Sequence, residues 1–199
     1  MSKIITPSDD ELKSKKKLAL FDLDGTLFST NDVNWYAYKE ALAHFGFAFE
    51  YDYWFRNCIG RHYKDFLSDI GITDEPTLLE IHRLKKQAYK KYLGHAKVNE
   101  HLFALIELMR PEYYLALVTT ASRKNVEDIL TAFDKMNVFD KRFTQEDFSK
   151  MKPDPEGYLK AMEHFNIRPE DTIIFEDSET GLAAAKASGA YYYGVFGFN

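Results

Sequence analysis

The segment "ALFDLDGTLFST", residues 19–30, places Asp22 and Asp24 two positions apart at the end of a short apolar run. The run "KLALF", residues 17–21, is typical of a buried parallel strand that ends at Asp22. Gly25 then permits a sharp turn after this strand. A strand period of two residues directs both carboxylates to one side and Leu23 into the core. The segment therefore predicts a strand with paired acidic side chains at its carboxyl end.

Three further apolar runs predict strands at 113–120, 171–177 and 191–196. Helical periodicity is found in the stretches 100–109, 123–133, 154–165 and 179–188. Strands and helices in alternation predict an α/β fold, in which a Rossmann-like parallel sheet forms the middle of three layers. Ligands of such folds bind at the carboxyl ends of the strands.

The first two predicted strands are separated by about 90 residues, which is more than one crossover helix requires. Helical spacing within this stretch covers residues 31–46, 61–71 and 74–94, each of which ends at a glycine. We therefore expect an α/β core formed by residues 1–29 and 99–199. Residues 30–98 are expected to form an inserted α-helical cap.

The composition excludes several classes of protein. The 199 residues carry 26 Lys and Arg against 31 Asp and Glu, so that the net charge of −5 offers no basic face for nucleic acid. No apolar run approaches the roughly 20 residues needed to cross a bilayer, which argues against a membrane partner. The start of the chain lacks the apolar core of a signal peptide, and the single Cys58 cannot form an intramolecular disulfide. We expect a cytoplasmic protein that is a monomer.

Four polar clusters follow predicted strands or lie in one loop. They are Asp22 with Asp24, Thr119 with Thr120, Lys152 in "KPDP", and Glu176 with Asp177. The topology predicts that all four converge on one crevice. Carboxylates this close would repel one another unless a divalent cation lay among them. Oxygen ligands without His or Cys favour Mg²⁺, which also accepts a phosphate oxygen as a ligand.

These residue types suit phosphoryl transfer. Asp22, kept ionised by the cation, can attack phosphorus and form an aspartyl phosphate. Asp24 can protonate the leaving oxygen and later accept a proton from the attacking water. Lys152 can supply positive charge to the phosphoryl oxygens, while the Thr119 hydroxyl and the Thr120 backbone N–H can supply donors.

The sequence "DLDGT", residues 22–26, resembles the signature of the haloacid dehalogenase (HAD) superfamily. The stretches "LVTTAS", "MKPDPEGY" and "IIFEDSETG" follow in the order of that superfamily and extend the resemblance over nearly the whole chain. It implies a HAD-like core with a helical cap, as in the branch of β-phosphoglucomutase and phosphoglycolate phosphatase.

The same resemblance implies individual roles. Asp22 would be the nucleophile, Asp24 the general acid and base, and Thr119 and Lys152 the residues that hold the phosphoryl group. Mg²⁺ would be held by Asp22, the Asp24 carbonyl and Asp177, with Glu176 as a further carboxylate of the metal site.

Two positions leave alternatives open. Thr30 matches a residue near the phosphate on the hinge side, but we favour its interpretation as the N-cap of the first cap helix. Tyr63, in "IGRHYKDF", stands where the mutase has an arginine that grips the distal phosphate. This difference counts against mutase activity, although Arg61, His62 or Lys64 could reach in from the same loop.

The sequence therefore predicts a phosphoric monoester hydrolase: a Mg²⁺-dependent phosphatase that hydrolyses a small phosphorylated metabolite through an aspartyl phosphate. A cap that closes over the site would exclude bulky macromolecular substrates. A phosphosugar mutase is the alternative with the same chemistry, and a noncatalytic binding protein is the alternative without it.

Overall fold

A computed structural model describes residues 15–197; residues 1–14, at the start of the expected core segment 1–29, and 198–199 lie outside it. Its five-stranded sheet has the order β5-β4-β1-β6-β7. The strands are β1 Lys17–Phe21, β4 Tyr113–Val118, β5 Lys141–Phe143, β6 Thr172–Glu176 and β7 Tyr191–Gly194. All neighbouring strands are parallel. The predicted α/β fold is confirmed, and β5 is a strand that the sequence analysis did not predict.

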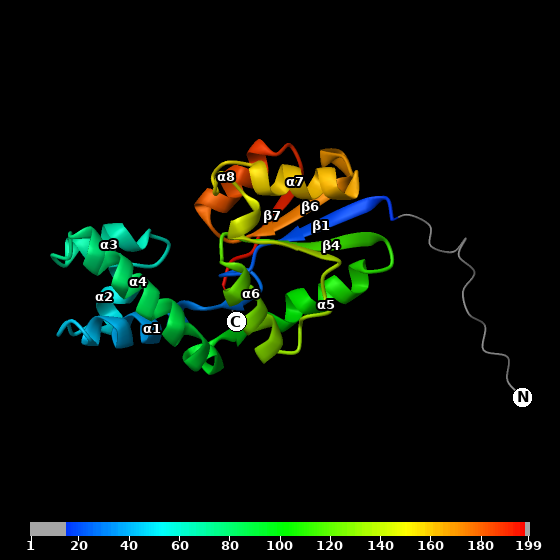
Figure 1. The fold of residues 1–199 in the computed structure, drawn as a ribbon. Coiled ribbons are helices and arrows are strands. Elements are labelled where there is room, and N and C mark those ends of the chain that lie inside the picture. The colour runs from blue at the N-terminus through cyan, green and yellow to red at the C-terminus, as the bar shows by residue number, and fades with distance from the viewer. Residues whose placement is uncertain (1–14, 198–199) are drawn as a thin grey trace, which may run out of the picture.

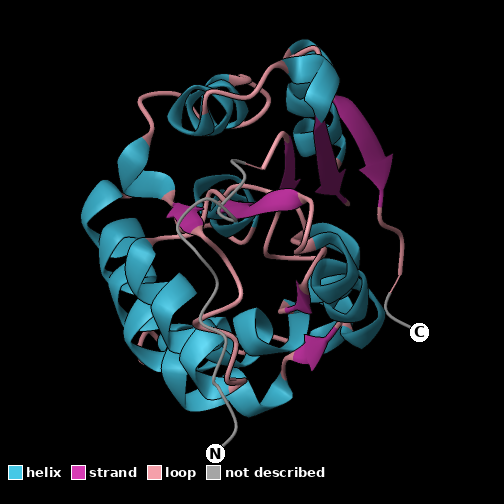
Figure 2. Cartoon of the chain, turned by 90° about the vertical axis from the view of Figure 1, so that its right-hand side faces the viewer, coloured by secondary structure: helices cyan, strands magenta, loops and turns pink. Residues whose placement is uncertain are grey.

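Helices cover both faces of this sheet (Figure 1). They are α5 Glu100–Met109 and α6 Arg123–Ala132 on one face, and α7 Glu156–Phe165 and α8 Glu179–Ala187 on the other. Short 3-10 helices cover Gln145–Asp147 and Pro169–Asp171. Figure 2, turned by 90°, shows the strands between helices. The three predicted layers are therefore present.

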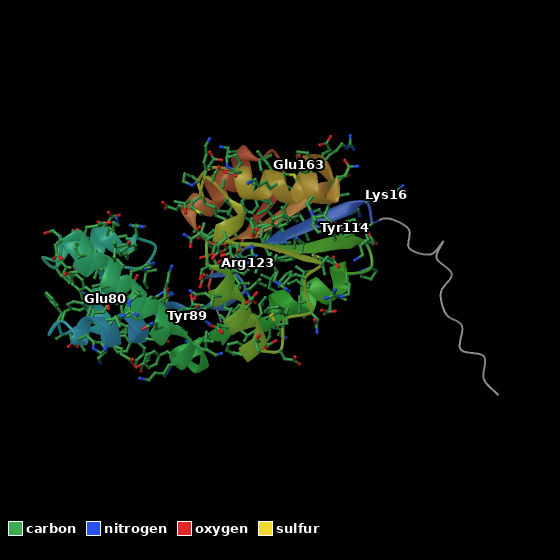
Figure 3. The ribbon with its side chains drawn as sticks, viewed as in Figure 1. Lys16, Glu80, Tyr89, Tyr114, Arg123 and Glu163 are labelled. Atoms are coloured by element: carbon green, nitrogen blue, oxygen red, sulfur yellow. The ribbon has the colours of Figure 1, made fainter. Side chains whose placement is uncertain are left out.

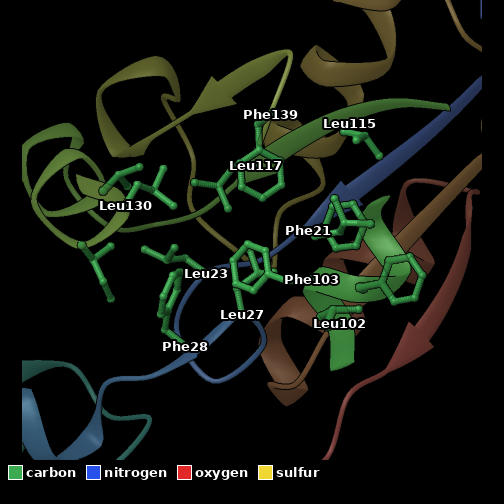
Figure 4. Packing of buried hydrophobic residues seen from close by; sticks show 14 of the residues in the cluster. Phe21, Leu23, Leu27, Phe28, Leu102, Phe103, Leu115, Leu117, Leu130 and Phe139 are labelled. Carbon is green, nitrogen blue, oxygen red and sulfur yellow. The ribbon is translucent and has the colours of Figure 1, made fainter. Parts of the chain in front are cut away.

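Strand β1 contributes to both sides of the core because its side chains alternate. Ala19 and Phe21 belong to the apolar cluster under α5 and α6, and Leu18 and Leu20 to the cluster under α7 and α8. Figure 4 shows Phe21 within the first cluster. Leu23 belongs to this cluster too and is fully buried, as the alternation predicted.

Four helices lie between β1 and β4: α1 Asn31–Ala43, α2 Tyr51–Asn57, α3 Tyr63–Asp69 and α4 Glu75–Tyr89. A 3-10 helix, η2 Lys90–His95, follows them. We call residues 31–95 the helical insertion. It has an apolar cluster of its own, which includes Tyr38, Leu42, Trp54, Phe66 and Ile81. Figure 1 shows this group beside one end of the sheet, in the range where the sequence predicts a cap.

The two connections to the helical insertion run side by side. Strand β2 (Phe28–Ser29) pairs antiparallel with β3 (Lys97–Val98). Just beyond this ribbon, the backbone N–H of Asn99 donates to the Leu27 carbonyl over 2.9 Å. The entry and exit of the insertion are thus joined at the edge of the sheet that carries the acidic residues. No helix within residues 15–197 has both the length and the apolar character needed to cross a membrane.

Candidate active site

The predicted polar residues meet at the carboxyl ends of β1, β4 and β6. Asp22 directly follows β1, Glu176 ends β6, and Lys152 comes from the loop before α7. The Lys152 ammonium donates to Asp22 Oδ1 over 2.5 Å and to Glu176 Oε1 over 2.6 Å. It also donates to the carbonyl of Val118, which directly precedes Thr119, over 3.2 Å. One buried lysine therefore joins three of the four predicted clusters.

Thr119 is buried at the end of β4. Its backbone N–H donates to the Phe143 carbonyl over 3.1 Å, and its hydroxyl accepts from the N–H of Ala121 over the same distance. The next residue, Thr120, lines a cavity that also borders Asp24. The loop after β4 therefore presents a fixed threonine beside the acidic crevice.

Electrostatics in this cluster are set by burial. Desolvation opposes the charged form of Lys152, but Asp22 and Glu176 outweigh it and hold the pKa of Lys152 well above its usual value. Burial raises the pKa of Asp22, with the Glu176 charge acting in the same direction and Lys152 against both. The lysine is thus a permanent cation within an excess of carboxylates.

Glu176 is almost fully buried, and both of its carboxylate oxygens have partners. Oε1 accepts from Lys152 and, over 3.4 Å, from the Tyr158 hydroxyl, while Oε2 accepts from the backbone N–H and hydroxyl of Ser178. A Cβ at Gly181 would overlap this carboxylate, so the glycine is required for the close approach of α8. These contacts allow Glu176 to position Lys152, and its expected role in a metal site stays a prediction.

Asp177 lies against the turn that follows Asp24. The Thr26 hydroxyl donates to Asp177 Oδ1 over 2.8 Å, and a Cβ at Gly25 would overlap the same carboxylate. Gly25 has a φ of +91°, a conformation that favours glycine. Burial raises the pKa of Asp177 to about 6. The signature glycine therefore lets Asp177 approach the Asp22 and Asp24 loop.

The oxygen atoms at this end of the sheet fit a hard divalent cation. Four carboxylates, those of Asp22, Asp24, Glu176 and Asp177, surround one paired ammonium, and an excess of buried negative charge is costly unless a cation offsets it. Among residues 15–197, no three His, Cys, Asp or Glu side chains form a metal-binding group. The expected set consists of the side chains of Asp22 and Asp177, the backbone carbonyl of Asp24 and the further carboxylate of Glu176, and it stays a prediction.

Thr30 has a different partner from the one that we favoured. It directly precedes α1, but its side chain makes no capping hydrogen bond, so the N-cap interpretation is wrong for the hydroxyl. The hydroxyl donates to Asp24 Oδ1 over 2.5 Å and accepts from Asn34 Nδ2 over 3.3 Å. Burial raises the pKa of Asp24, whereas the Thr30 hydrogen bond lowers it.

Lys85 of α4 is a buried residue that the sequence analysis missed, since "HRLKKQAY" has the composition of a solvated helix face. It is 8% exposed. Its ammonium lies over the rings of Tyr38 and Tyr89, 5.3 and 4.9 Å from their centroids. Figure 3 labels Tyr89 on the insertion and Arg123 on the core, on the two sides of this junction. Burial lowers the pKa of Lys85 to about 8, although Asp24 opposes that shift.

Two cavities of about 310 Å³ each border Asp24, Asn34 and Lys85. The apolar cavity also reaches Asp177 and is otherwise lined mainly by side chains of the insertion, among them Tyr38, Trp54, Ile59 and Phe66. The basic cavity lies between His62, Tyr63, His82, Lys85, Lys86 and Tyr89 of the insertion and Thr120, Ala121, Ser122, Asn125 and Gln145 of the core. Both cavities therefore lead from Asp24 into the helical insertion.

The structure distinguishes the three alternatives around Tyr63. Tyr63 stacks on His82 with the ring centroids 4.1 Å apart. Arg61 pairs with Asp69 over 2.8 Å and lines the apolar cavity, and Lys64 pairs with Glu75 over 2.7 Å. His62 is the one of the three that lines the basic cavity.

Comparison with known proteins identifies the family. Residues 19–195 match the model of the haloacid dehalogenase-like hydrolases. The chain belongs to this family. It is 30% identical to the validoxylamine A 7'-phosphate phosphatase of Streptomyces hygroscopicus subsp. limoneus over 90% of this chain and 85% of that protein. It is 29% identical to the phosphorylated carbohydrates phosphatase of Thermotoga maritima, over 88% and 83%.

Solved structures agree with this haloacid dehalogenase-like assignment. CbbY from Rhodobacter sphaeroides, in complex with phosphate, matches with a TM-score of 0.78 and 26% identity over 92% of this chain and 87% of that one. A putative β-phosphoglucomutase from Thermotoga maritima matches with a TM-score of 0.72 and 28% identity over the same shares. The predicted superfamily, branch and enzyme class, a phosphoric monoester hydrolase, are confirmed.

Proposed function

We propose that the protein is a Mg²⁺-dependent phosphatase that hydrolyses a small phosphorylated metabolite through an aspartyl phosphate on Asp22. The observation that carries this proposal is the contact of Lys152 with both Asp22 and Glu176 at the carboxyl edge of the sheet. A lysine fixed beside a carboxylate that follows the first strand provides a nucleophile and a phosphate-binding cation in one place. Relatives named as phosphatases of validoxylamine A 7'-phosphate and of phosphorylated carbohydrates support the substrate class.

In the first step, an oxygen of Asp22 attacks phosphorus and the ester P–O bond breaks. Asp24 donates a proton to the leaving alkoxide, a role that its raised pKa favours. In the second step, water attacks the aspartyl phosphate, Asp24 accepts a proton from the water, and inorganic phosphate leaves while Asp22 is regenerated. Thr30 fixes the orientation of Asp24 through its hydrogen bond.

The transferred phosphoryl group needs donors around its three equatorial oxygens. Lys152 supplies a positive charge there, and the Thr119 hydroxyl and Thr120 N–H supply neutral donors. Asp22, the Asp24 carbonyl and Asp177 would hold Mg²⁺, which supplies positive charge for phosphate binding and keeps Asp22 ionised. Glu176 would keep Lys152 in place from behind.

The helical insertion would act as the cap. Both cavities that border Asp24 are walled by it, and their size suits a small substrate and not a macromolecule. A monomer located in the cytoplasm remains our prediction, which light scattering of the purified protein and localisation of a tagged copy would test.

The test is hydrolysis of 4-nitrophenyl phosphate with and without Mg²⁺, for the unaltered protein and for Asp22→Asn. We expect turnover that requires Mg²⁺ and falls at least about 10³-fold in the variant. Asp52→Asn, an exposed aspartate of α2, is the matched control and should retain full activity. Turnover that survives Asp22→Asn or EDTA would contradict the mechanism, and isomerised sugar phosphate in excess of free phosphate would indicate the mutase.

A further inference from the structure

The two edges of the central sheet differ in charge. At one edge, two of the three residues of β5, Lys141 and Arg142, are charged, which disfavours pairing with a further strand. At the other edge, the four residues of β7, "YYYG", carry no charge. Within residues 15–197, no strand pairs with the outer side of β7. The β7 edge therefore lacks the protection that β5 has.

The backbone of β7 presents hydrogen-bonding groups on its outer side. The N–H of Val195, directly beyond the strand, donates to the Glu176 carbonyl over 2.8 Å and so points toward β6. Backbone groups of successive strand residues point to alternate sides, so the N–H groups of Tyr192 and Gly194 point away from β6. Outward groups of this kind are a template for a further strand.

Aromatic side chains are exposed along the same edge. Tyr191, Tyr192 and Tyr193 are 68%, 46% and 64% exposed, and Phe196 is 76% exposed. Such side chains bury about 150–250 Å² each when covered, so these exposed fractions together represent roughly 500 Å². Exposed apolar surface of several hundred Å² on a folded chain commonly marks a site of interaction.

A cavity of about 410 Å³ lies beside β7 on the face of the sheet that α5 covers. Leu102 and Leu105 of α5 line it, together with Tyr193, Val195 and Phe196. Among the described residues that line it there is no Asp, Glu, Lys or Arg. The cavity therefore suits an apolar side chain from a strand that lies next to β7.

The first 14 residues of the chain, which lie outside the described residues, contain one stretch that fits this edge. The sequence "KIIT", residues 3–6, has two adjacent β-branched apolar side chains, those of Ile4 and Ile5, and Pro7 follows it. Such residues favour strands, and proline is excluded from strand interiors. Residues 8–14 have a single apolar side chain, that of Leu12, and are suited to a connection.

The connection is long enough to reach β7. Strands β1 and β7 begin at the same end of the sheet, because Ala19 and Tyr191 are both level with Ile173 of β6. A strand outside β7 would lie three strand spacings from β1, or about 14 Å. The chain from Thr6 to Lys15 can span about 30 Å when extended. It must return to the start of β1, so the added strand would run antiparallel to β7, as edge strands of parallel sheets often do.

We propose that residues 3–6 form an antiparallel edge strand beside β7. Ile4 and Ile5 would point to opposite faces, so that one enters the apolar cavity beside α5 and the other covers Tyr192 on the opposite face. The expected core segment 1–29 would then contribute a sixth strand to the sheet. The inference concerns the sheet edge and does not depend on the proposed phosphatase activity.

The test is hydrogen exchange of the Tyr192 and Gly194 amides in the full-length protein, followed by NMR. Ile4→Asp combined with Ile5→Asp should make both amides exchange at least about tenfold faster, because two charged side chains oppose the pairing. Ser2→Asp combined with Ser8→Asp adds the same charge to the same segment and should change exchange less than about twofold. Equal exchange in the two variants would overturn the inference.

Two further readings identify the occupant of the edge. Amides of β5 should exchange equally in all three proteins, and faster exchange at β5 in place of β7 would overturn the inference. Light scattering at the concentration of the exchange experiment should give the mass of one chain. A mass of two chains, with protection of β7 that disappears on dilution and survives Ile4→Asp with Ile5→Asp, would assign the edge to a second copy and overturn the inference.

Discussion

The two walls of the site carry opposite excesses of charge. On the core side, Lys152 is paired with Asp22 and Glu176, and further carboxylates lie nearby. On the side of the helical insertion, the buried Lys85 has no hydrogen-bond or ion-pair partner among residues 15–197; its ammonium lies over the rings of Tyr38 and Tyr89, and Asp24 borders the same cavities. The pKa of Lys152 is accordingly held well above its usual value by its carboxylate partners in spite of burial, whereas burial lowers that of Lys85 to about 8.

This difference indicates which ligand each wall lacks. An excess of buried carboxylate favours a cation, and an excess of buried ammonium favours an anion. Preorganised charges of this kind act in the reaction without further rearrangement of the protein. In the proposed function, the core would carry out the chemistry and the insertion would select the substrate.

The largest effect is expected from Lys152→Met. Loss of this cation should lower kcat for 4-nitrophenyl phosphate by about 10³-fold, because the phosphoryl oxygens lose their charged donor. It should also lower the free energy of unfolding by about 3 kcal/mol, because Asp22 and Glu176 remain buried without a counterion. Steady-state kinetics and urea unfolding of the metal-free protein measure the two effects.

Lys85→Met is the matched change on the other wall. Methionine has a similar volume and removes a buried charge whose desolvation outweighs the attraction of Asp24, so we expect the free energy of unfolding to rise by about 1 kcal/mol. Urea unfolding under the same conditions measures it. If both methionine variants shifted stability in the same direction, the contrast between a paired and an unpaired lysine would be wrong.

A smaller effect is expected from Glu176→Gln. The amide preserves shape but removes the charge that holds Lys152, so kcat should fall by about tenfold to a hundredfold while the fold is retained. Kinetics with saturating Mg²⁺ tests this, with exposed Glu170→Gln as the control that should behave as the unaltered protein. A change in the Mg²⁺ concentration for half-maximal rate, with kcat unchanged, would instead indicate that Glu176 binds the metal.

Much of the core side of the site could be predicted from sequence because three of its residues directly follow strands. Asp22, Thr119 and Asp177 stand at the first positions after β1, β4 and β6, and parallel strands bring such positions together. Local sequence thus specified both the residue and its place. Thr30 was assigned the wrong partner because a threonine before a helix suits an N-cap equally well, and only the folded turn brings its hydroxyl to Asp24.

The insertion side was less predictable because its packing is tertiary. Lys85 lies among charged neighbours on α4, and it is buried only because α1 supplies Tyr38 against it. Helix α2 was missed because its seven residues, "YDYWFRN", have too little length for a clear period. Strand β5 was missed because two of its three residues, Lys141 and Arg142, are charged, as is common at the edge of a sheet.

Thr30→Val tests how the insertion entrance acts on the core chemistry. Loss of the hydroxyl removes the hydrogen bond that lowers the pKa of Asp24, so this pKa should rise further. We expect the limb of the pH profile of kcat that reports Asp24 to move to higher pH, with kcat at neutral pH lowered up to about tenfold. Thr77→Val, a half-buried threonine at the start of α4, is the control. An unchanged profile would remove Thr30 from the site.

The smallest effect concerns the stability of the metal-free protein between pH 5 and pH 7. Burial raises the pKa of Asp177 to about 6 from 3.8, so its contribution to stability is fully present below pH 3.8 and is lost as the pH rises through about 6. We therefore expect the melting temperature of the unaltered protein to fall by roughly a few degrees between pH 5 and pH 7. The melting temperature of Asp177→Asn should depend less on pH. Differential scanning fluorimetry in EDTA measures both.

Mg²⁺ should reverse this trend, because it binds the ionised form of the site and so stabilises the protein more at pH 7 than at pH 5. The contrast between the core wall and the insertion wall depends on the direction of these two pH effects on stability. If Asp177→Asn and the unaltered protein lost stability in parallel, and Mg²⁺ acted equally at both pH values, the core would not carry an uncompensated negative charge. The basic residues of the insertion would then not face an excess of negative charge on the core.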